Sequence, residues 1–321
     1  LLLASSQPMT DRDVCRVQQI GASHKKRRFG SVGRFGIGLN CMYTVADAFS
    51  LLANGHLYVF DPLRAVVARR HENGKNFKCE TLEATFPQML EPFVRFRSQW
   101  PTIFRLPLRK SQSQFGPRRS VPEVQQLLDE FEATTQEALI FSKHLRCVCF
   151  EARGKSMELR AQCSALEGDA HALSHNLPSS PEEVNALRAQ PRSAISFVEI
   201  QCLQSGASSQ ASKCTASKWV VVHSLEMSQE LFELLQARVN ARDDALLLPH
   251  GAAALRLGAP GGQQYHGHLC CQFPLSAMPC GPPLLLHGHF DLHSSRKAVP
   301  LPPPAAPGTA SGTRAEQWND A

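Results

Sequence analysis

Three glycines fall within six positions of residues 33–38, and an apolar stretch follows them directly. Glycine permits positive φ angles and lets the backbone approach a bulky group closely. The first amides of a helix carry the positive end of its dipole and bind phosphate groups. The segment therefore predicts a loop that holds the phosphates of a nucleotide; the alternative is a tight turn that needs small residues. The predicted loop consists of Gly33, Arg34, Phe35, Gly36, Ile37 and Gly38.

Cationic and nucleophilic side chains elsewhere give weaker signals. The densest basic run, KKRR at residues 25–28, is most simply a solvated loop. No aromatic residues alternate with these cations, so nucleic-acid binding is disfavoured. No serine or cysteine lies in a G-x-S-x-G context, and we predict no catalytic residue.

Histidines and cysteines gather in two apolar runs, YHGHLCCQ and LLHGHFDLH. Strand alternation would place His266 and His268 on one face, and likewise His287 and His289, so that two strands could supply four ligands. A zinc site needs four converging ligands, commonly in CxxC pairs, and this spacing does not match one. We therefore expect polar positions on a half-exposed sheet and no metal site.

The composition is that of a globular protein. The chain has 321 residues, of which 43% are hydrophobic and 19% charged, with a net charge of +6. This length suits two domains, and no apolar run approaches the roughly 18 residues that span a membrane. The 11 cysteines are odd in number, and those in CVC and CC lie in strand-like runs. This pattern favours buried free thiols over disulfides, and with them a reduced cytoplasmic setting.

Residues 1–150 predict a first α/β region. Leu39, Met42, Tyr43, Ala46 and Phe49 share one helical face, so the spacing predicts a helix after Gly38. A hairpin is expected around Asn54-Gly55, with its second strand ending at Asp61-Pro62. A strand over 102–110 and a helix over 121–146 complete this region.

Beyond this region the pattern changes. Residues 151–190 are expected to form an irregular linker, since periodicity is lost from residue 163 onward. Strands over 194–203, 218–225, 253–258, 268–275 and 283–292 and a helix over 228–239 predict a second, mostly antiparallel α+β domain at 191–298. The Pro-, Ala- and Gly-rich residues 299–321 are typical of a flexible tail.

Four collinear segments resemble one family. VGRFGIGLNCMYTVADAFSLLANGHLYVFDP is similar to the glycine-rich box of the GHKL ATPases, the class of heat-shock protein 90, and within that class to the sacsin repeats. SHKK upstream, TIFRLPLR, and FPLSAMPCGPPLLLHGHFDLHSSRK resemble sacsin segments in the same order. The resemblance implies part of a GHKL (Bergerat-type) α/β sandwich, which has a mixed sheet with helices on one face and is incomplete at its N-terminus. A second α+β domain follows it.

The resemblance also implies a nucleotide site for ATP with magnesium. Lys25 would reach a phosphate across the glycine loop, and Arg296 would reach the γ-phosphate from the second domain. The family helix that carries a glutamate and an asparagine would precede Leu1, and Ser5 or Ser6 stands where the family has an adenine-binding Asp or Asn. We therefore expect ATP binding that is weak or lost, and hydrolysis by this chain alone is disfavoured.

The function that the resemblance implies is a cytoplasmic chaperone or co-chaperone module that contacts client proteins or heat-shock chaperones. The first alternative is a non-catalytic interaction module that kept the fold and lost the nucleotide. A weaker alternative is a DNA-repair or topoisomerase relative of the same superfamily. Membrane and nucleic-acid partners are not expected.

Overall fold

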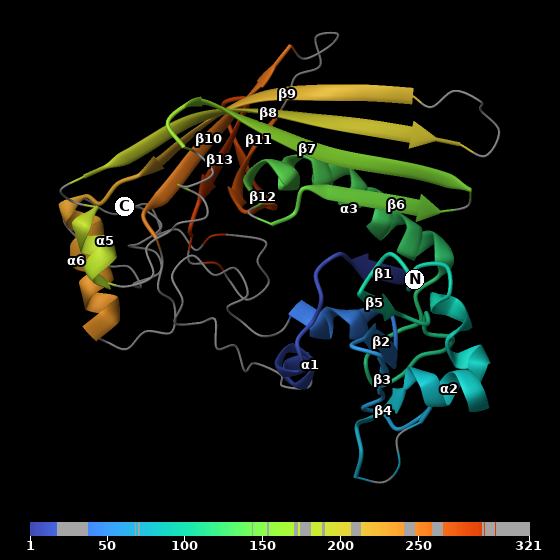
Figure 1. The fold of residues 1–321 in the computed structure, drawn as a ribbon. Helices are drawn as coiled ribbons and strands as arrows, with labels where there is room; N and C mark the ends of the chain where they lie inside the picture. The colour runs from blue at the N-terminus through green and yellow to red at the C-terminus, as the bar shows by residue number, and fades with distance from the viewer. Residues whose placement is uncertain are drawn as a thin grey trace. The chain divides into compact units, whose positions relative to one another are not determined.

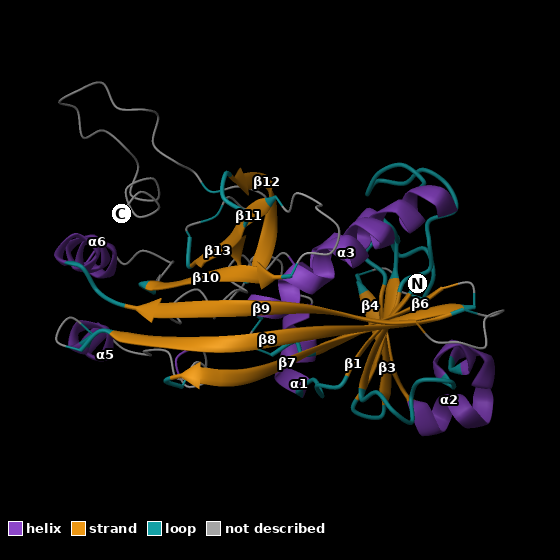
Figure 2. Cartoon of the chain, turned by 90° about the horizontal axis from the view of Figure 1, so that it is seen from above, coloured by secondary structure: helices purple, strands orange, loops and turns teal. Residues whose placement is uncertain are grey.

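The computed structural model describes residues 1–17, 38–67, 69, 71–142, 144–152, 154–169, 173, 181–187, 190–206, 213–240, 248–258, 266–290, 292 and 299. They form a mixed α+β structure with two β-sheets (Figures 1 and 2), which confirms the predicted fold class. The chain divides into two compact units, and among the described residues the division falls between Leu128 and Asp129. No helix in the described part is long and apolar enough to cross a membrane.

The first unit contains a five-stranded sheet. Its strands are β1 (Leu2–Ser5), β2 (Phe49–Ala53), β3 (His56–Phe60), β4 (Gly74–Lys78) and β5 (Thr102–Arg105), in the order β1-β5-β2-β3-β4. Every neighbouring pair is antiparallel, whereas the sandwich that we expected has a mixed sheet. The connection between β2 and β3 explains part of this difference, because a two-residue turn can join only antiparallel neighbours.

Short helices pack against this sheet: α1 (Asp11–Val17), η1 (Gly38–Thr44), α2 (Cys79–Thr85), η2 (Pro87–Met89) and η3 (Glu91–Phe93). The predicted helix from Gly38 to Phe49 is wrong beyond Thr44, because η1 is a seven-residue 3₁₀ helix and Phe49 begins β2. All five residues of β2 are buried between β3 and β5, so strand pairing outweighs the helical spacing of the apolar residues. A helix this short also has a smaller dipole than the one we expected.

The predicted hairpin is confirmed. Asn54 and Gly55 join β2 to β3 with φ angles of 52° and 71°, and β3 ends at Phe60, directly before Asp61. The predicted strand over 102–110 is β5, which ends at Arg105. The predicted helix over 121–146 is α3 (Val121–Phe141), which is five residues shorter.

The second unit contains an eight-stranded sheet. Its strands are β6 (Cys147–Ala152), β7 (Lys155–Glu167), β8 (Arg192–Ser205), β9 (Lys213–Leu225), β10 (His250–Leu257), β11 (Gly267–Cys271), β12 (Phe273–Cys280) and β13 (Leu284–Gly288). Their order is β12-β11-β13-β10-β9-β8-β7-β6, and β11–β13 is the parallel pair in this otherwise antiparallel sheet. Helices α5 (Pro181–Ala186) and α6 (Gln229–Asn240) lie at one end of the sheet (Figure 1).

Two details of this sheet differ from the expectation. Strand β7 occupies residues that we expected in an irregular linker, and it pairs along nearly its whole length with β8. The predicted strand over 268–275 is two strands, because Gln272 adopts a φ of 63° and turns the chain between β11 and β12. The other predicted strands and the helix over 228–239 are confirmed within a few residues.

The core of the second unit lies between one face of this sheet and the C-terminal part of α3. Alternate residues of β7, β8 and β9 are buried, among them Leu159, Ile200 and Trp219, and they pack against Leu139 and Phe141 of α3. Trp219 is 1% exposed, and its indole N–H donates to Ser217 Oγ at 3.1 Å. Strand alternation therefore assigns each side chain either to the core or to the outer face.

We predict that Gly55→Ala lowers the free energy of unfolding by about 1–2 kcal/mol, because an alanine Cβ is strained at this positive φ. Denaturant unfolding of the full chain measures the loss. Gly281→Ala is the matched control, since Gly281 has open space at its Cβ position and no positive φ. Equal stability of Gly55→Ala and the control variant would contradict the turn geometry.

Candidate functional site

The predicted nucleotide loop lies almost entirely outside the described residues. This holds for Lys25, for residues 33–37 and for Arg296, so their role in phosphate binding stays a prediction. Gly38, the last residue of the predicted loop, is described and begins η1. The structure therefore shows how the chain that leaves this loop is fixed in the first unit.

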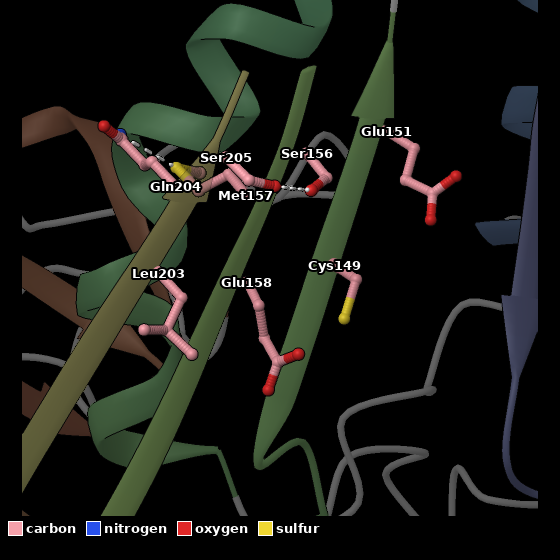
Figure 3. A pocket seen from close by; sticks show the side chains of 8 residues that line it. All are labelled: Cys149, Glu151, Ser156, Met157, Glu158, Leu203, Gln204 and Ser205. Atoms are coloured by element: carbon pink, nitrogen blue, oxygen red, sulfur yellow. Dashed lines mark hydrogen bonds between the residues drawn. The ribbon is translucent and has the colours of Figure 1, made fainter. Parts of the chain in front are cut away.

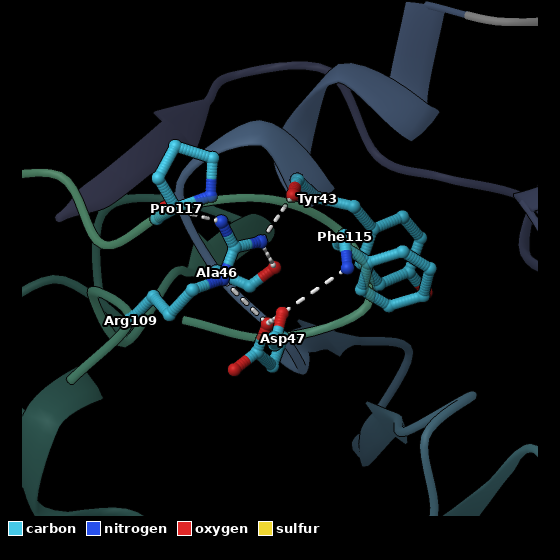
Figure 4. Close-up of polar contacts among 7 residues, drawn as sticks. Tyr43, Ala46, Asp47, Arg109, Phe115 and Pro117 are labelled. Carbon is cyan, nitrogen blue, oxygen red and sulfur yellow. Dashed lines mark hydrogen bonds and ion pairs between the residues drawn. The ribbon is translucent and has the colours of Figure 1, made fainter. Parts of the chain in front are cut away.

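Arg109 holds the segment that follows η1 (Figure 4). Its Nε donates to Asp47 Oδ1 at 2.6 Å, and its Nη2 donates to the Tyr43 carbonyl oxygen at 2.7 Å. Its Nη1 donates to the Pro117 carbonyl oxygen at 2.8 Å. A guanidinium is suited to this position because its planar fork presents donors in several directions. One side chain therefore joins the end of η1 to the chain beyond β5.

The anchor is buried and reinforced on both sides. The Arg109 side chain is 0% exposed, so its charge depends on these partners rather than on water. Ser113 Oγ donates to the same oxygen of Asp47 at 2.6 Å, and the Arg109 amide donates to the Val45 carbonyl oxygen at 2.9 Å. Arg109 therefore acts in two ways, through its backbone and through its side chain, on the segment after η1.

The ring of Tyr43 packs against two phenylalanine rings in the same region. The ring centroid lies 5.3 Å from that of Phe49 and 4.9 Å from that of Phe115. Burial, and secondarily the charge of Asp61, raises the pKa of Tyr43 to about 12. The phenol is therefore neutral at physiological pH and acts here as a packing residue.

Asp61 is a buried anion in this unit. Its side chain is 0% exposed, and its carboxylate accepts hydrogen bonds from the amides of Ala65, Val66 and Val67 at 2.7–2.9 Å. These three amides are therefore occupied by a carboxylate of the protein itself. The sequence pattern predicts Asp61 only as a strand end, although an aspartate that starts a turn commonly accepts bonds from the following amides.

The histidines assemble differently from the expectation. His266 is exposed before β11, and His268 faces the carboxylate of Glu137, with 3.5 Å between Nδ1 and Oε2. His287 and His289 are buried, so the prediction of a half-exposed position is wrong for both.

His223 and His250 lie beside His287 and His289, where the sequence predicted His266 and His268. All four histidines are at most 8% exposed, and neighbouring ring centroids lie 5.5–5.7 Å apart. They line a cavity of about 140 Å³ that Arg146 and Asp169 also face. Burial lowers the pKa of His223, whose Nδ1 has no hydrogen-bond partner among the described residues. At neutral pH this histidine is therefore uncharged.

The cysteine expectation is confirmed in part. All 11 cysteines are free thiols, as expected. Burial holds for Cys202, Cys270 and Cys271, but it fails for the CVC segment, where Cys147 is half-buried and Cys149 is exposed. These two side chains point to the outer face of the sheet, because Val148 and Phe150 pack against the core.

Comparison with known proteins places the chain in a family. Residues 1–163, half of the chain, match the Sacsin domain, so the chain belongs to the Sacsin domain family. Sacsin of Homo sapiens is 25% identical to it over 315 residues. That alignment covers 92% of this chain and 7% of Sacsin, so the chain spans a small part of the length of this relative. The resemblance drawn from the glycine-rich segment is confirmed at this level.

We predict that Arg109→Met lowers the free energy of unfolding by about 2–4 kcal/mol, because it leaves Asp47 and several carbonyl oxygens without their buried donor. Arg97→Met is the matched control, since Arg97 and its partner Glu83 form an exposed ion pair worth at most about 1 kcal/mol. Denaturant unfolding compares the two variants, and equal losses would contradict the anchoring role.

We predict that the folded protein loses stability as the pH falls below about 6.5, the ordinary pKa of histidine. Burial lowers the pKa of His223, so the unfolded chain binds the proton more readily and acid favours unfolding. His223→Phe removes this titration and keeps a ring beside His250. Denaturant unfolding between pH 5 and pH 8 should give a shallower dependence for the variant. Identical profiles for the variant and the wild type would contradict the prediction.

Proposed function

We propose that this chain is a sacsin-type chaperone or co-chaperone module whose glycine-rich segment binds ATP weakly. The observation that carries the proposal is the family match over residues 1–163, which includes the glycine-rich segment at 33–38. In this proposal the backbone amides of that segment hold the phosphates, with magnesium as counter-ion. Client proteins or heat-shock chaperones are the proposed partners, and the cytoplasm is the proposed location.

The Arg109 anchor supports this proposal physically. A loop that closes around a phosphate needs fixed ends, since ordering a flexible segment costs free energy that reduces the affinity. Arg109 fixes the chain only a few residues after Gly38 through Asp47 and the Tyr43 carbonyl oxygen. The proposal concerns binding and not hydrolysis, because hydrolysis requires a positioned general base and the sequence predicts no catalytic residue in this chain.

A non-catalytic interaction module is the second candidate. Ser5 ends β1, and its hydroxyl oxygen accepts a hydrogen bond from the Gln7 amide at 3.2 Å. A serine at this position does not replace the carboxylate or amide that the family resemblance places against adenine. In this candidate the module contacts proteins with no dependence on nucleotide.

We predict that Gly36→Val abolishes the binding of ATP with magnesium by the full chain, because a branched side chain keeps the backbone from the phosphates. Isothermal titration calorimetry measures the affinity. Gly281→Val is the matched control, since it changes a glycine with open space that lies outside the glycine-rich segment. Equal affinity in Gly36→Val and the wild type would refute the loop assignment, and no binding in the wild type would favour the interaction module.

A second measurement separates the candidate functions. The full chain is added to a chemically unfolded model protein, and the suppression of its aggregation is followed by light scattering with and without ATP. Suppression that changes with ATP in the wild type and not in Gly36→Val supports the proposed module. Suppression of aggregation that does not depend on ATP supports the interaction module. Binding of duplex DNA and not of the unfolded protein supports the DNA-repair relative.

A further inference from the structure

Two thiols and a carboxylate meet on the outer face of β6 and β7. Cys147 and Cys149 are two residues apart on β6 and therefore lie on the same side of the strand. Glu158 on β7 pairs directly with Cys149, and Arg160 pairs directly with Cys147. One ligand atom from each of Cys147, Cys149 and Glu158 lies within 4.8 Å of the other two. Figure 3 shows Cys149 and Glu158 side by side on the two strands.

We propose that Cys147, Cys149 and Glu158 bind a thiophilic divalent cation of the Zn²⁺ class. Two sulfur ligands disfavour Mg²⁺ and Ca²⁺, which prefer oxygen, and they favour zinc or a similar soft ion. Three protein ligands leave the fourth tetrahedral position for water or a ligand from a partner. The site is independent of the proposed nucleotide loop, with which it shares no residue.

The sulfur positions agree with this coordination. The two Sγ atoms are 3.9 Å apart. Two sulfurs that each lie ~2.3 Å from one zinc ion at a tetrahedral angle are separated by about 3.8 Å. A disulfide would instead require the sulfurs to approach to about 2.05 Å. The observed separation therefore matches that of two sulfurs bound to one zinc ion.

The protons of the cluster can be replaced by a cation. Both thiols lie near the Glu158 carboxylate, within 4.8 Å of its nearest ligand oxygen. Arg160 donates to Glu158 Oε1 through Nε at 3.0 Å and Nη2 at 2.6 Å. Binding forms two metal–sulfur bonds and one metal–oxygen bond, breaks two S–H bonds and releases two protons to solvent. With the positive charge of Arg160, a divalent cation then leaves the cluster with no net charge.

The strands hold the ligands in place before an ion binds. β6 and β7 pair over six consecutive residue pairs, and β7 pairs with β8 on its other side. Ser156 and Ser205 add a hydrogen bond of 2.6 Å between β7 and β8 at the same face. A hollow of about 260 Å³ adjoins Cys149 and Glu158, which leaves room for the fourth ligand (Figure 3).

The first experiment identifies the ligands without any substitution. The reduced full chain is titrated with Co²⁺, a spectroscopic substitute for Zn²⁺, and then with Zn²⁺. We expect a thiolate-to-cobalt charge-transfer band that Zn²⁺ abolishes and that excess Mg²⁺ does not affect. Alkylation followed by mass spectrometry should show that Zn²⁺ protects Cys147 and Cys149 and that both react without metal. Unchanged alkylation of these two cysteines at saturating Zn²⁺ would overturn the proposal.

Variants test the ligand set. Cys147→Ser and Cys149→Ser should each remove the charge-transfer band. Glu158→Gln should lower the affinity for Zn²⁺ by at least the ~10–100-fold that loss of a hydrogen-bond partner of a metal ligand costs. Cys214→Ser is the matched control, because Cys214 is an exposed thiol on β9 of the same sheet. Circular dichroism confirms folding. A band that persists in both cysteine variants, or disulfide formation between Cys147 and Cys149 in place of metal binding, would overturn the proposal.

Discussion

The structure of the second unit depends on one constraint, the alternation of side chains along the strands of its eight-stranded sheet. Consecutive residues of a strand point to opposite faces, and only one face is covered by α3. On the covered face, the row that buries Trp219 and Val221 in β9 continues to His223, which is therefore desolvated. On the outer face, the same alternation brings Cys149 opposite Glu158. A single geometric rule thus produces an apolar core, a buried histidine cavity and a partly exposed thiol–carboxylate cluster.

In the first unit, long irregular segments between short strands and helices must be held in place. Its strands have only four or five residues each, so ladder hydrogen bonds do little to position the segments that connect them. Arg109 and Asp61 position these segments instead, because each is a buried charge that forms hydrogen bonds with backbone groups of the loops. A buried charge is costly unless every partner is present, and this requirement makes the loop geometry unique. The exposed pair of Arg97 and Glu83 imposes no comparable requirement.

The sequence predicts the elements that have a local signal and misses those that depend on distant partners. Asn54-Gly55 and the helical period of α3 are local, and both are confirmed. The helix to Phe49 is wrong because the pairing of β2 with its neighbours decides that segment. Arg109 and Asp47 are 62 residues apart in the chain, and no local pattern joins them. Strand alternation pairs His287 with His289, but their partners come from β9 and β10 and cannot be paired with them without the sheet order.

The family match and the folded second unit end at different residues. The match ends at residue 163, inside β7, which lies between β6 and β8 in the sheet. β7 pairs with β8 from Ser156 to Glu167, and its buried Leu159 packs in one core with residues of β8, β9, β10 and β13. A protein cut at residue 163 would therefore expose a long unpaired strand edge and one side of its core, both of which promote aggregation. The second unit is thus intact only with the strands through β13, and the thiol–carboxylate cluster inside the matched segment depends on strands outside it.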